Sequence, residues 1–458
     1  MSTANTNATI AANRFGLGAK PGELVQAEKN PKKWLSAQLM PISFDQSLPT
    51  SNDVFKQLSE FNLAYKKKKN KSDTEQFKKA KKDRARFIKS TYQKLATDAF
   101  VQSINSDSSL TWRLLDFFSN HFSVSADGKM MPAIGPTLER EAIANNLFNR
   151  FEDMLLAVSK HPAMLIYLNN ERSFGPNSKL ALNSKKNKNN KKGIGLNENL
   201  AREILELHTL GVNGGYSQND VIELAKGITG WSIANPNKDD GVGFTYRAWG
   251  KEPGKRTLLG KTYNQKGIKQ GEAMLKDLAN HPNTAKFVCS KLVKHFVSDS
   301  PDPQLVDILV KRWQKTGGNI KEVMLALIHS EQAWSAEQKK FKTPREYLQS
   351  SFRALNIKSI NFKQLFFTLN TFGQQPFKAG SPAGFSDEQQ DWDGGNALMS
   401  KIDWTASLVS RVRANAETIM NDTLALPTSS ITYKAVVRAE SRKQALAMLL
   451  MSPEFLRR

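Results

Sequence analysis

The sequence predicts a mainly α-helical, multi-helix globular protein with one small irregular β excursion near residues 231–263. Apolar residues recur at helical spacing through most of the chain. Pro, Gly and Asn separate these segments, as expected at helix ends. The exception is the excursion, where the β-favouring pieces Phe244 to Tyr246 and Thr257 to Leu259 alternate with Gly, Asn and Pro.

The helix predicted from Leu110 to His121 is the most apolar in the chain. Apolar residues cover one face and, through Trp112 and Leu115, much of the remainder, so we expect a helix that is buried nearly all round. The stretch from Gly373 to Gly395 is turn-rich but carries three aromatic residues, which predicts a loop packed against the body. Further helices are predicted near residues 23–40, 75–104, 140–168, 198–210, 218–229, 267–280, 284–298, 303–315, 320–330, 344–355, 396–418 and 434–451.

The length of 458 residues bounds the domain organisation. A single hydrophobic core stops growing at roughly 250–300 residues, so we expect two packed lobes or one large helical domain with insertions. The excursion would divide an N-terminal helical lobe, residues 11–230, from a C-terminal helical lobe, residues 264–458. Two basic insertions, at 66–89 and 185–192, fall within the first lobe.

These two insertions carry much of the net charge of +23. Residues 66–89 hold 12 Lys or Arg against 3 acids, and five lysines between Lys185 and Lys192 face no acid. The first tract is compatible with a helix that presents a solvated face, and a polyanion site is the alternative. The second has no aromatic residue for base stacking and is predicted to be a loop. The sequence therefore favours an anionic polymer or a protein as the partner over nucleic acid.

The sequence shows neither a transmembrane helix nor an export signal, and it contains a single cysteine. No apolar run approaches the ~18 residues that a transmembrane helix needs, and the polar start from Met1 to Ile10 does not resemble a signal peptide. The chain as written is therefore expected in the cytoplasm. Cys289, the single cysteine, excludes internal disulfides, and its apolar helical neighbours predict a buried thiol.

The densest polar cluster runs from Asn197 to Asp220 and predicts a helical hairpin. Asn197 can cap the first helix, Gly211 can end it, and Ser217 with Asp220 can form a capping box for the second. Glu198, Arg202 and Glu206 recur every four residues, with Glu203 beside them. They form either a surface ion-pair ladder or a buried acid/base site, and burial of Arg202 would favour the second.

Metal and cofactor signatures are weak. No two of the six histidines are spaced i, i+4, and neither a zinc motif nor an EF-hand loop is present, so the sequence predicts no metal. A site assembled across the fold, for example from His121 and Glu203, stays an alternative. Dinucleotide, P-loop and nucleophile-elbow motifs are also absent, and the sequence identifies no cofactor.

Ten segments in order, from about residue 11 to 458, resemble the bacterial family catalogued as domain of unknown function 1800, which implies one family-wide domain. The resemblance implies that His121 and the helix beginning at Asn197 form one polar site. The segments are ANRFGLGAKPGEL, FSNHFSVSA, EREAI, RFEDMLLAVSKHPAMLIYL, GLNENLAREILELHTLGVNGGYSQNDV, GWS, LANHPNTAKFVCSKLVKHFV, KFKTPREYL, GQQPFKAGSPAGF and MSPEFLRR. The catalytic residues expected on this basis are His121, Glu198, Arg202, Glu203 and Glu206, with Asn120 and Asn197 binding the substrate.

The resemblance leaves the reaction open. The expected function is that of an enzyme, a hydrolase or transferase of unassigned reaction, with a carboxylate, Arg and His pocket. The alternative is a non-catalytic basic protein that binds an anionic polymer or an envelope partner. Many relatives are exported, which keeps a periplasmic or envelope location open. The chain departs from the family pattern at 144–146, where Ala-Asn-Asn replaces Arg-Pro-His, and at Asn169, where Asp is usual.

Overall fold

Helices form most of the structure, in a computed structural model that describes residues 3–69, 74–186, 195–237, 239, 241–338 and 340–458. This confirms the predicted mainly α fold class. The helices are α1 (Thr3–Ile10), α2 (Glu23–Glu28), α3 (Pro31–Ala37), α4 (Ser51–Lys69), α5 (Thr74–Asn105), α6 (Ser109–His121), α7 (Met131–Ile134), α8 (Phe151–Lys160), α9 (Pro162–Tyr167), α10 (Lys179–Lys186), α11 (Asn199–Glu203), α12 (Gln218–Gly227), α13 (Ile268–Ala279), α14 (Pro282–Phe296), α15 (Pro303–Thr316), α16 (Ile320–His329), α17 (Pro344–Ala354), α18 (Phe362–Thr371), α19 (Gly395–Val409), α20 (Ala416–Thr423), α21 (Ile431–Val437), α22 (Arg442–Leu450) and α23 (Pro453–Leu456).

Three short π-helical segments extend this set: η1 (Ala11–Phe15), η2 (Glu139–Ile143) and η5 (Ile204–Thr209). A π turn inserts one residue into the helical repeat and frequently marks a functional position. The segment η2 contributes to the candidate site described below. The segment η5 continues α11 directly, so the helix predicted over 198–210 is α-helical only in its first half.

Proline and capping residues determine where many helices begin. His161 and His281 each precede a proline, and each imidazole accepts a hydrogen bond from a backbone N–H in the first turn of α9 or α14. Thr343 forms a capping box with Glu346 at the start of α17, as Ser217 does with Asp220 at α12. The capping box predicted for Ser217 is therefore confirmed.

Some predicted helices are shorter than their periodicity indicated. Residues 140–168 divide into η2, α8 and α9, because the chain turns at Asn145–Asn146 and Pro162 starts a new helix. Residues 396–418 and 434–451 also each contain two helices. The long helix α4 was not predicted, since the lysines at its end obscure its apolar face.

The excursion contains two separate antiparallel hairpins. Strand β1 (Trp231–Ile233) pairs with β2 (Phe244–Tyr246). The bounds of β2 are those of the predicted β-favouring piece. Strand β3 (Arg256–Leu258) pairs with β4 (Lys261–Tyr263). Leu259 and Gly260 make the β3–β4 turn, both with positive φ, as a tight two-residue hairpin turn requires.

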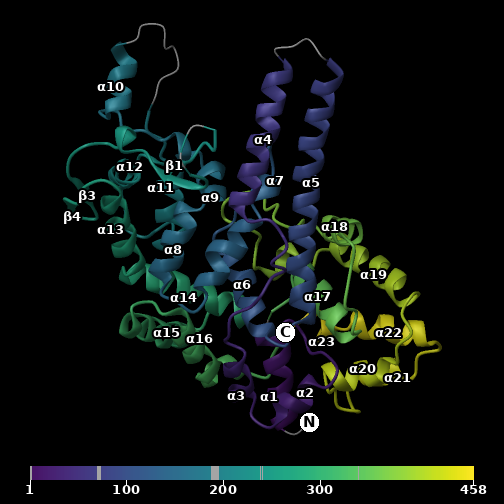
Figure 1. The fold of residues 1–458 in the computed structure, drawn as a ribbon. Helices are drawn as coiled ribbons and strands as arrows, with labels where there is room; N and C mark the ends of the chain where they lie inside the picture. Colours follow the sequence, from purple (N-terminus) through teal and green to yellow (C-terminus); the bar gives the residue numbers. More distant parts are fainter. Residues whose placement is uncertain (1–2, 70–73, 187–194, 238, 240, 339) are drawn as a thin grey trace.

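The largest hydrophobic cluster extends from Ala8 to Trp334, and a second extends from Phe341 to Leu456. The helix α6 lies at the centre, with α8 and α12 to α16 on one side and α18 to α22 on the other (Figure 1). Ten of its thirteen residues are buried, as the sequence predicted. Cys289 is buried as well. Among the described helices, none is long and apolar enough to cross a membrane.

A buried ion-pair cluster joins distant parts of the chain around Glu346 of α17. Arg113 Nη2 of α6 lies 2.5 Å from Glu346 Oε1, and Arg458 Nη2 lies 2.9 Å from the same oxygen. Arg113 also donates to the Gly16 carbonyl, at 2.7 Å. Burial alone would raise the pKa of Glu346, but Arg113 and Arg458 lower it well below its usual value. The cluster therefore fixes α6, α17 and both ends of the chain to one carboxylate.

Replacement of Arg113 by Met should destabilise the protein severely, because it leaves Glu346 short of a partner for a buried charge. Loss of one partner of a buried pair costs about 3–5 kcal/mol of unfolding free energy. Arg172→Met is the matched control, because the Arg172 side chain is 84% exposed and exposed pairs contribute at most about 1 kcal/mol. Urea unfolding measures both variants. Equal effects would show that the Glu346 cluster does not support the fold.

Candidate active site

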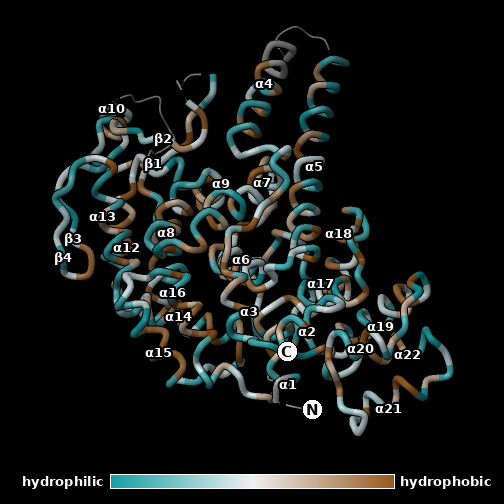
Figure 2. Tube along the Cα trace, turned by 60° about the horizontal axis from the view of Figure 1, so that its bottom comes forward, coloured by the Kyte–Doolittle hydropathy of each residue, from teal (hydrophilic) through white to brown (hydrophobic). Residues whose placement is uncertain are grey.

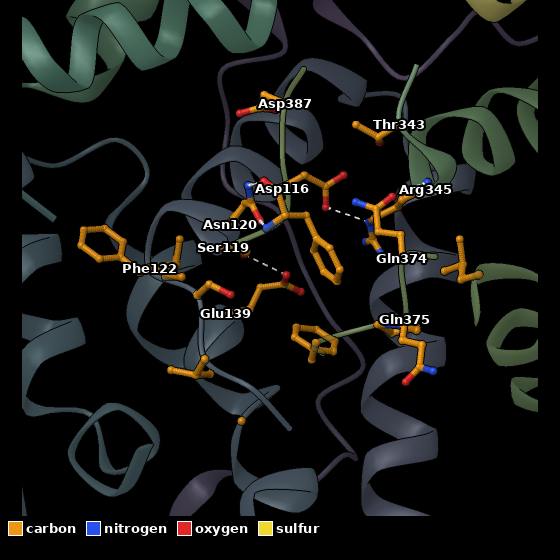
Figure 3. A pocket seen from close by; sticks show the side chains of 18 of the residues that line it. Asp116, Ser119, Asn120, Phe122, Glu139, Thr343, Arg345, Gln374, Gln375 and Asp387 are labelled. Atoms are coloured by element: carbon orange, nitrogen blue, oxygen red, sulfur yellow. Dashed lines mark hydrogen bonds and ion pairs between the residues drawn. The ribbon is translucent and has the colours of Figure 1, made fainter. Parts of the chain in front are cut away.

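A pocket with both polar and apolar lining residues lies where α6, η2, α14, α17 and the loop of residues 372–387 meet, and its volume is about 110 Å³ (Figure 3). Its lining combines carboxylates, amides and aromatic rings, a mixture typical of ligand sites. The principal polar residues are Asp116, Ser119 and Asn120 from α6, Glu139 from η2, His295 from α14, Thr343, Arg345 and Glu346 at the start of α17, and Gln374, Gln375 and Asp387 from the loop.

Glu139 is the least compensated carboxylate of this pocket. Its side chain is buried, Oε2 accepts a 2.8 Å hydrogen bond from Ser119 Oγ, and Oε1 has no protein partner among the described residues. Burial raises its pKa to about 7, opposed by Arg345 and reinforced by Asp116. At neutral pH the carboxyl group therefore populates both protonation states, as a general acid or base requires.

The π turn of η2 separates Glu139 from its charged neighbours in sequence. Arg140 extends away from the pocket and binds Asp98, with Nη1 2.7 Å from Oδ2. Glu141 accepts hydrogen bonds from Ser51 and lies 3.1 Å from His161 Nε2. Of the three charged residues in the turn, only Glu139 faces the pocket, because Arg140 and Glu141 bind partners outside its lining.

Asp116 and Arg345 form an ion pair in the wall of the pocket, with 3.1 Å between Nε and Oδ1 (Figure 3). Gln349 supports the carboxylate from α17, at 3.3 Å. The backbone N–H of Arg345 donates to Gln374 Oε1, at 2.7 Å, so the pair also binds the loop. The guanidinium group next to Glu139 favours the ionised form of that carboxyl group.

His295 and Asp387 form a second polar pair at the pocket. Nδ1 of His295 lies 3.0 Å from Asp387 Oδ1, and a carboxylate can only accept, so Nδ1 carries the hydrogen. Burial lowers the pKa of His295, although Asp387 opposes this, so the ring is neutral near pH 7. Its Nε2 therefore has a lone pair, and no described group donates to it. Burial would raise the pKa of Asp387, but the hydrogen bond from His295 and the charge of Lys340 lower it to about 2.

The loop of residues 372–387 covers one side of the pocket and is fixed mainly by Asn120. The Asn120 side chain donates to the Phe385 carbonyl at 2.8 Å and accepts from the Phe385 N–H at 2.7 Å. Gly384 passes so close that a Cβ atom would lie 2.5 Å from the Asn120 carbonyl oxygen. Tyr92 and Ala126 also hold the loop, through the carbonyls of Pro376 and Phe377.

His121 follows Asn120 in α6 but does not line the pocket. Its Nε2 lies 3.1 Å from the His208 carbonyl oxygen, so Nε2 carries the hydrogen and Nδ1 accepts from Lys291 Nζ at 3.2 Å. Burial, with Lys291 next, lowers its pKa well below the usual value. His121 is therefore a neutral histidine that links α6 to η5 and α14.

The remaining residues of the expected site lie on α11, on η5 or directly before α11, away from the pocket lining. Arg202 Nη2 is 3.3 Å from Glu198 Oε2, and their side chains are 40% and 33% exposed, so this pair is the surface ion pair that the spacing allowed. Burial and Glu206 raise the pKa of the half-buried Glu203. Asn197 Oδ1 accepts from the Asn199 N–H at 2.9 Å. Of the seven expected residues, the pocket includes Asn120 alone.

Within the part of the chain that the structure describes, no three His, Cys, Asp or Glu side chains converge as ligands for a metal ion.

Three of the main pocket residues lie in segments that resemble the family, but no sequence spacing links them to one another. Glu139 belongs to EREAI, Arg345 to KFKTPREYL, and His295 ends LANHPNTAKFVCSKLVKHFV. Glu139 lies more than a hundred residues before both His295 and Arg345, so only the tertiary fold brings these side chains together. Asp116 stood in the predicted α6 helix as a lone acid among apolar residues, which is the one local signal for this site.

Comparison with known proteins gives one match. The family model described as protein of unknown function (DUF1800) covers residues 10–457. Neither the curated proteins nor the solved structures include a match to the chain. The match covers nearly every residue, and the chain therefore belongs to the DUF1800 family of proteins of unknown function.

Proposed function

We propose that this protein is an enzyme in which Glu139 transfers a proton to or from a substrate group bound in the pocket. The observation that carries the proposal is the state of this carboxyl group, which is buried, held by Ser119 through one oxygen and unpartnered at the other. Its pKa of about 7 suits either direction of transfer at neutral pH. Hydrolysis and group transfer are the reaction classes that such a group commonly serves.

The neighbouring groups supply complementary roles. Ser119 fixes the orientation of the Glu139 carboxyl group. Arg345 offers positive charge, moderated by Asp116, where negative charge develops during the reaction. The free Nε2 of His295, oriented by Asp387, provides a second base. Two titratable groups in different environments can then act as acid and base in one cycle.

The size of the pocket limits the substrate. One water molecule needs roughly 10–15 Å³ of cavity volume, so a pocket of about 110 Å³ holds several waters or one small polar group. The enzyme therefore acts on a small molecule or on the terminal group of a larger one. The uncompensated Glu139 favours neutral or cationic groups over anionic ones.

The helix that begins at Asn197 is the alternative location for the catalytic group. In its favour, Glu203 has a pKa raised by burial and by Glu206. The Tyr216 hydroxyl group lies 3.5 Å from Glu206 Oε2 and would assist proton transfer at this location. The two locations differ in their essential carboxylate, so isosteric substitutions of Glu139 and Glu203 distinguish them.

Glu139→Gln should abolish turnover, whereas Glu203→Gln should leave it within about twofold. Acid/base catalysis contributes about 10²–10⁴-fold, so we expect kcat/KM to fall by at least about a hundredfold in the first variant. Small chromogenic esters, amides, glycosides and phosphate esters, assayed between about pH 5 and 9, provide the readout. The reverse pattern would place the reaction at the Asn197 helix. Equal activity in all three proteins, or none in any, would contradict an enzyme that depends on Glu139.

Glu139 should also make stability depend on pH. Its pKa is raised from 4.5 to about 7 in the folded protein, so its contribution is fully present below pH 4.5 and is lost as the pH rises through 7. At 1.36 kcal/mol per unit, the loss in unfolding free energy is on the order of 3 kcal/mol. Relative to the wild type, Glu139→Gln should therefore gain stability between pH 5 and pH 8.

Urea unfolding at both pH values measures this difference. Glu440→Gln serves as the control, because the Glu440 side chain is exposed and is not part of the pocket lining. A pH-independent difference between the wild type and Glu139→Gln would show that Glu139 is ionised throughout this range.

A further inference from the structure

The helices α4 and α5 form a hairpin that projects from the body of the protein (Figure 1). The second half of α5 is anchored, with Phe100 packed on Phe352 of α17 and Tyr92 packed on Phe362 of α18. The first half leaves the body and packs mainly on α4, where the rings of Phe61 and Phe87 lie 5.7 Å apart. Residues of this projecting half are largely hydrophilic (Figure 2).

Four basic residues of α5 share one face of the projecting half. At 100° per residue, Lys78, Lys82, Arg86 and Lys89 fall within an arc of about 80°, and at 1.5 Å per residue they span about 16 Å. All four side chains are exposed. We call this set the basic stripe. The packing face is opposite, because Ala80 and Ile88 are each only 8% exposed.

Acidic residues offset only part of the charge of the basic stripe, because its ion pairs are formed by exposed side chains and are weak. Residues 75–89 contain seven Lys or Arg and two acids. Glu75 pairs with Lys78 at 3.2 Å, and Asp83 pairs with Arg86 at 3.6 Å. Lys79 and Lys81 add exposed positive charge at the edges of the stripe. The adjoining lysines at 66–69 and 71 extend the same charge in the sequence, but their side chains lie outside the described residues.

The chemistry of this face restricts its partner. Phe77 and Phe87 are half-buried on the packing side, so the stripe presents no aromatic ring on which an unpaired base could stack. It also presents no apolar side chain that could enter a lipid bilayer, as a membrane-binding amphipathic helix does. What remains is a linear row of cations, which matches anions that repeat along a polymer. One strand of a duplex carries a phosphate about every 3.4 Å along the axis, so about five phosphates span the stripe.

We propose that the basic stripe binds a linear polymer through phosphates repeated along its backbone, without recognising sequence. The binding is independent of the reaction proposed for Glu139, which lies on η2 in a pocket that includes no residue of the stripe. The surface would hold the protein on a phosphate polymer while the pocket stays open to its own substrate.

A short fluorescent duplex DNA tests this proposal, with the full-length protein titrated from low to physiological salt. Replacement of all four stripe residues by Gln should weaken binding at least about tenfold at low salt. It should also reduce the slope of log K against log salt by about 3 to 4, because each phosphate contact contributes about 0.9. Long-chain inorganic polyphosphate, added as competitor, distinguishes a phosphodiester duplex from a polyphosphate chain as the preferred polymer.

The matched control is the variant with Lys266, Lys269, Lys311 and Lys315 replaced by Gln, which removes the same charge from exposed positions elsewhere. It should change affinity by less than about threefold, with an unchanged melting temperature in both variants. Equal loss in the control would show a general charge effect and overturn the proposal. Absence of binding to both polymers at low salt would overturn it too, as would tighter binding to phosphatidylserine vesicles than to either polymer.

Discussion

A carboxylate buried between two guanidinium groups determines how the pocket is assembled. Glu346 binds Arg113 of α6 and Arg458 near the end of the chain, and its oxygen Oε2 accepts from the Thr343 N–H at the start of α17. The first turn of α17 carries Arg345, and α6 carries Asp116 one turn after Arg113. The Asp116–Arg345 pair and the wall beside Glu139 therefore depend on the geometry of the charge cluster around Glu346.

The pocket keeps polar groups that the fold leaves unsatisfied. Glu139 Oε1 and His295 Nε2 are buried without partners among the described residues, although most buried polar atoms in proteins are hydrogen-bonded. Such atoms reduce stability, and proteins tolerate them where a ligand or a reaction uses them. The contrast with Glu346 is informative. Both carboxylates are buried, but only Glu346 is paired, so their pKa values move in opposite directions.

The fold could be predicted to a large extent because its signals are local. Periodicity identified α6, and proline or capping residues identified the starts of α12, α14 and α17. Interruptions such as the one after η2 were missed, because neither Asn145 nor Asn146 forbids a helix. The site was harder to predict. Glu139 looks like any surface acid in EREAI, and its burial and its coupling to Asp116 and Arg345 arise only from tertiary contacts.

The protonation state of Glu139 at neutral pH is the most direct test of this account. Infrared difference spectra of the wild type and Glu139→Gln, recorded across a pH titration, isolate the carboxyl stretch of this one residue. A band for the protonated acid that disappears with a midpoint near pH 7 is the predicted result. A midpoint near 4.5, the ordinary value for glutamate, would mean that Glu139 is a permanent anion at neutral pH and would contradict its role as the proton-transfer group.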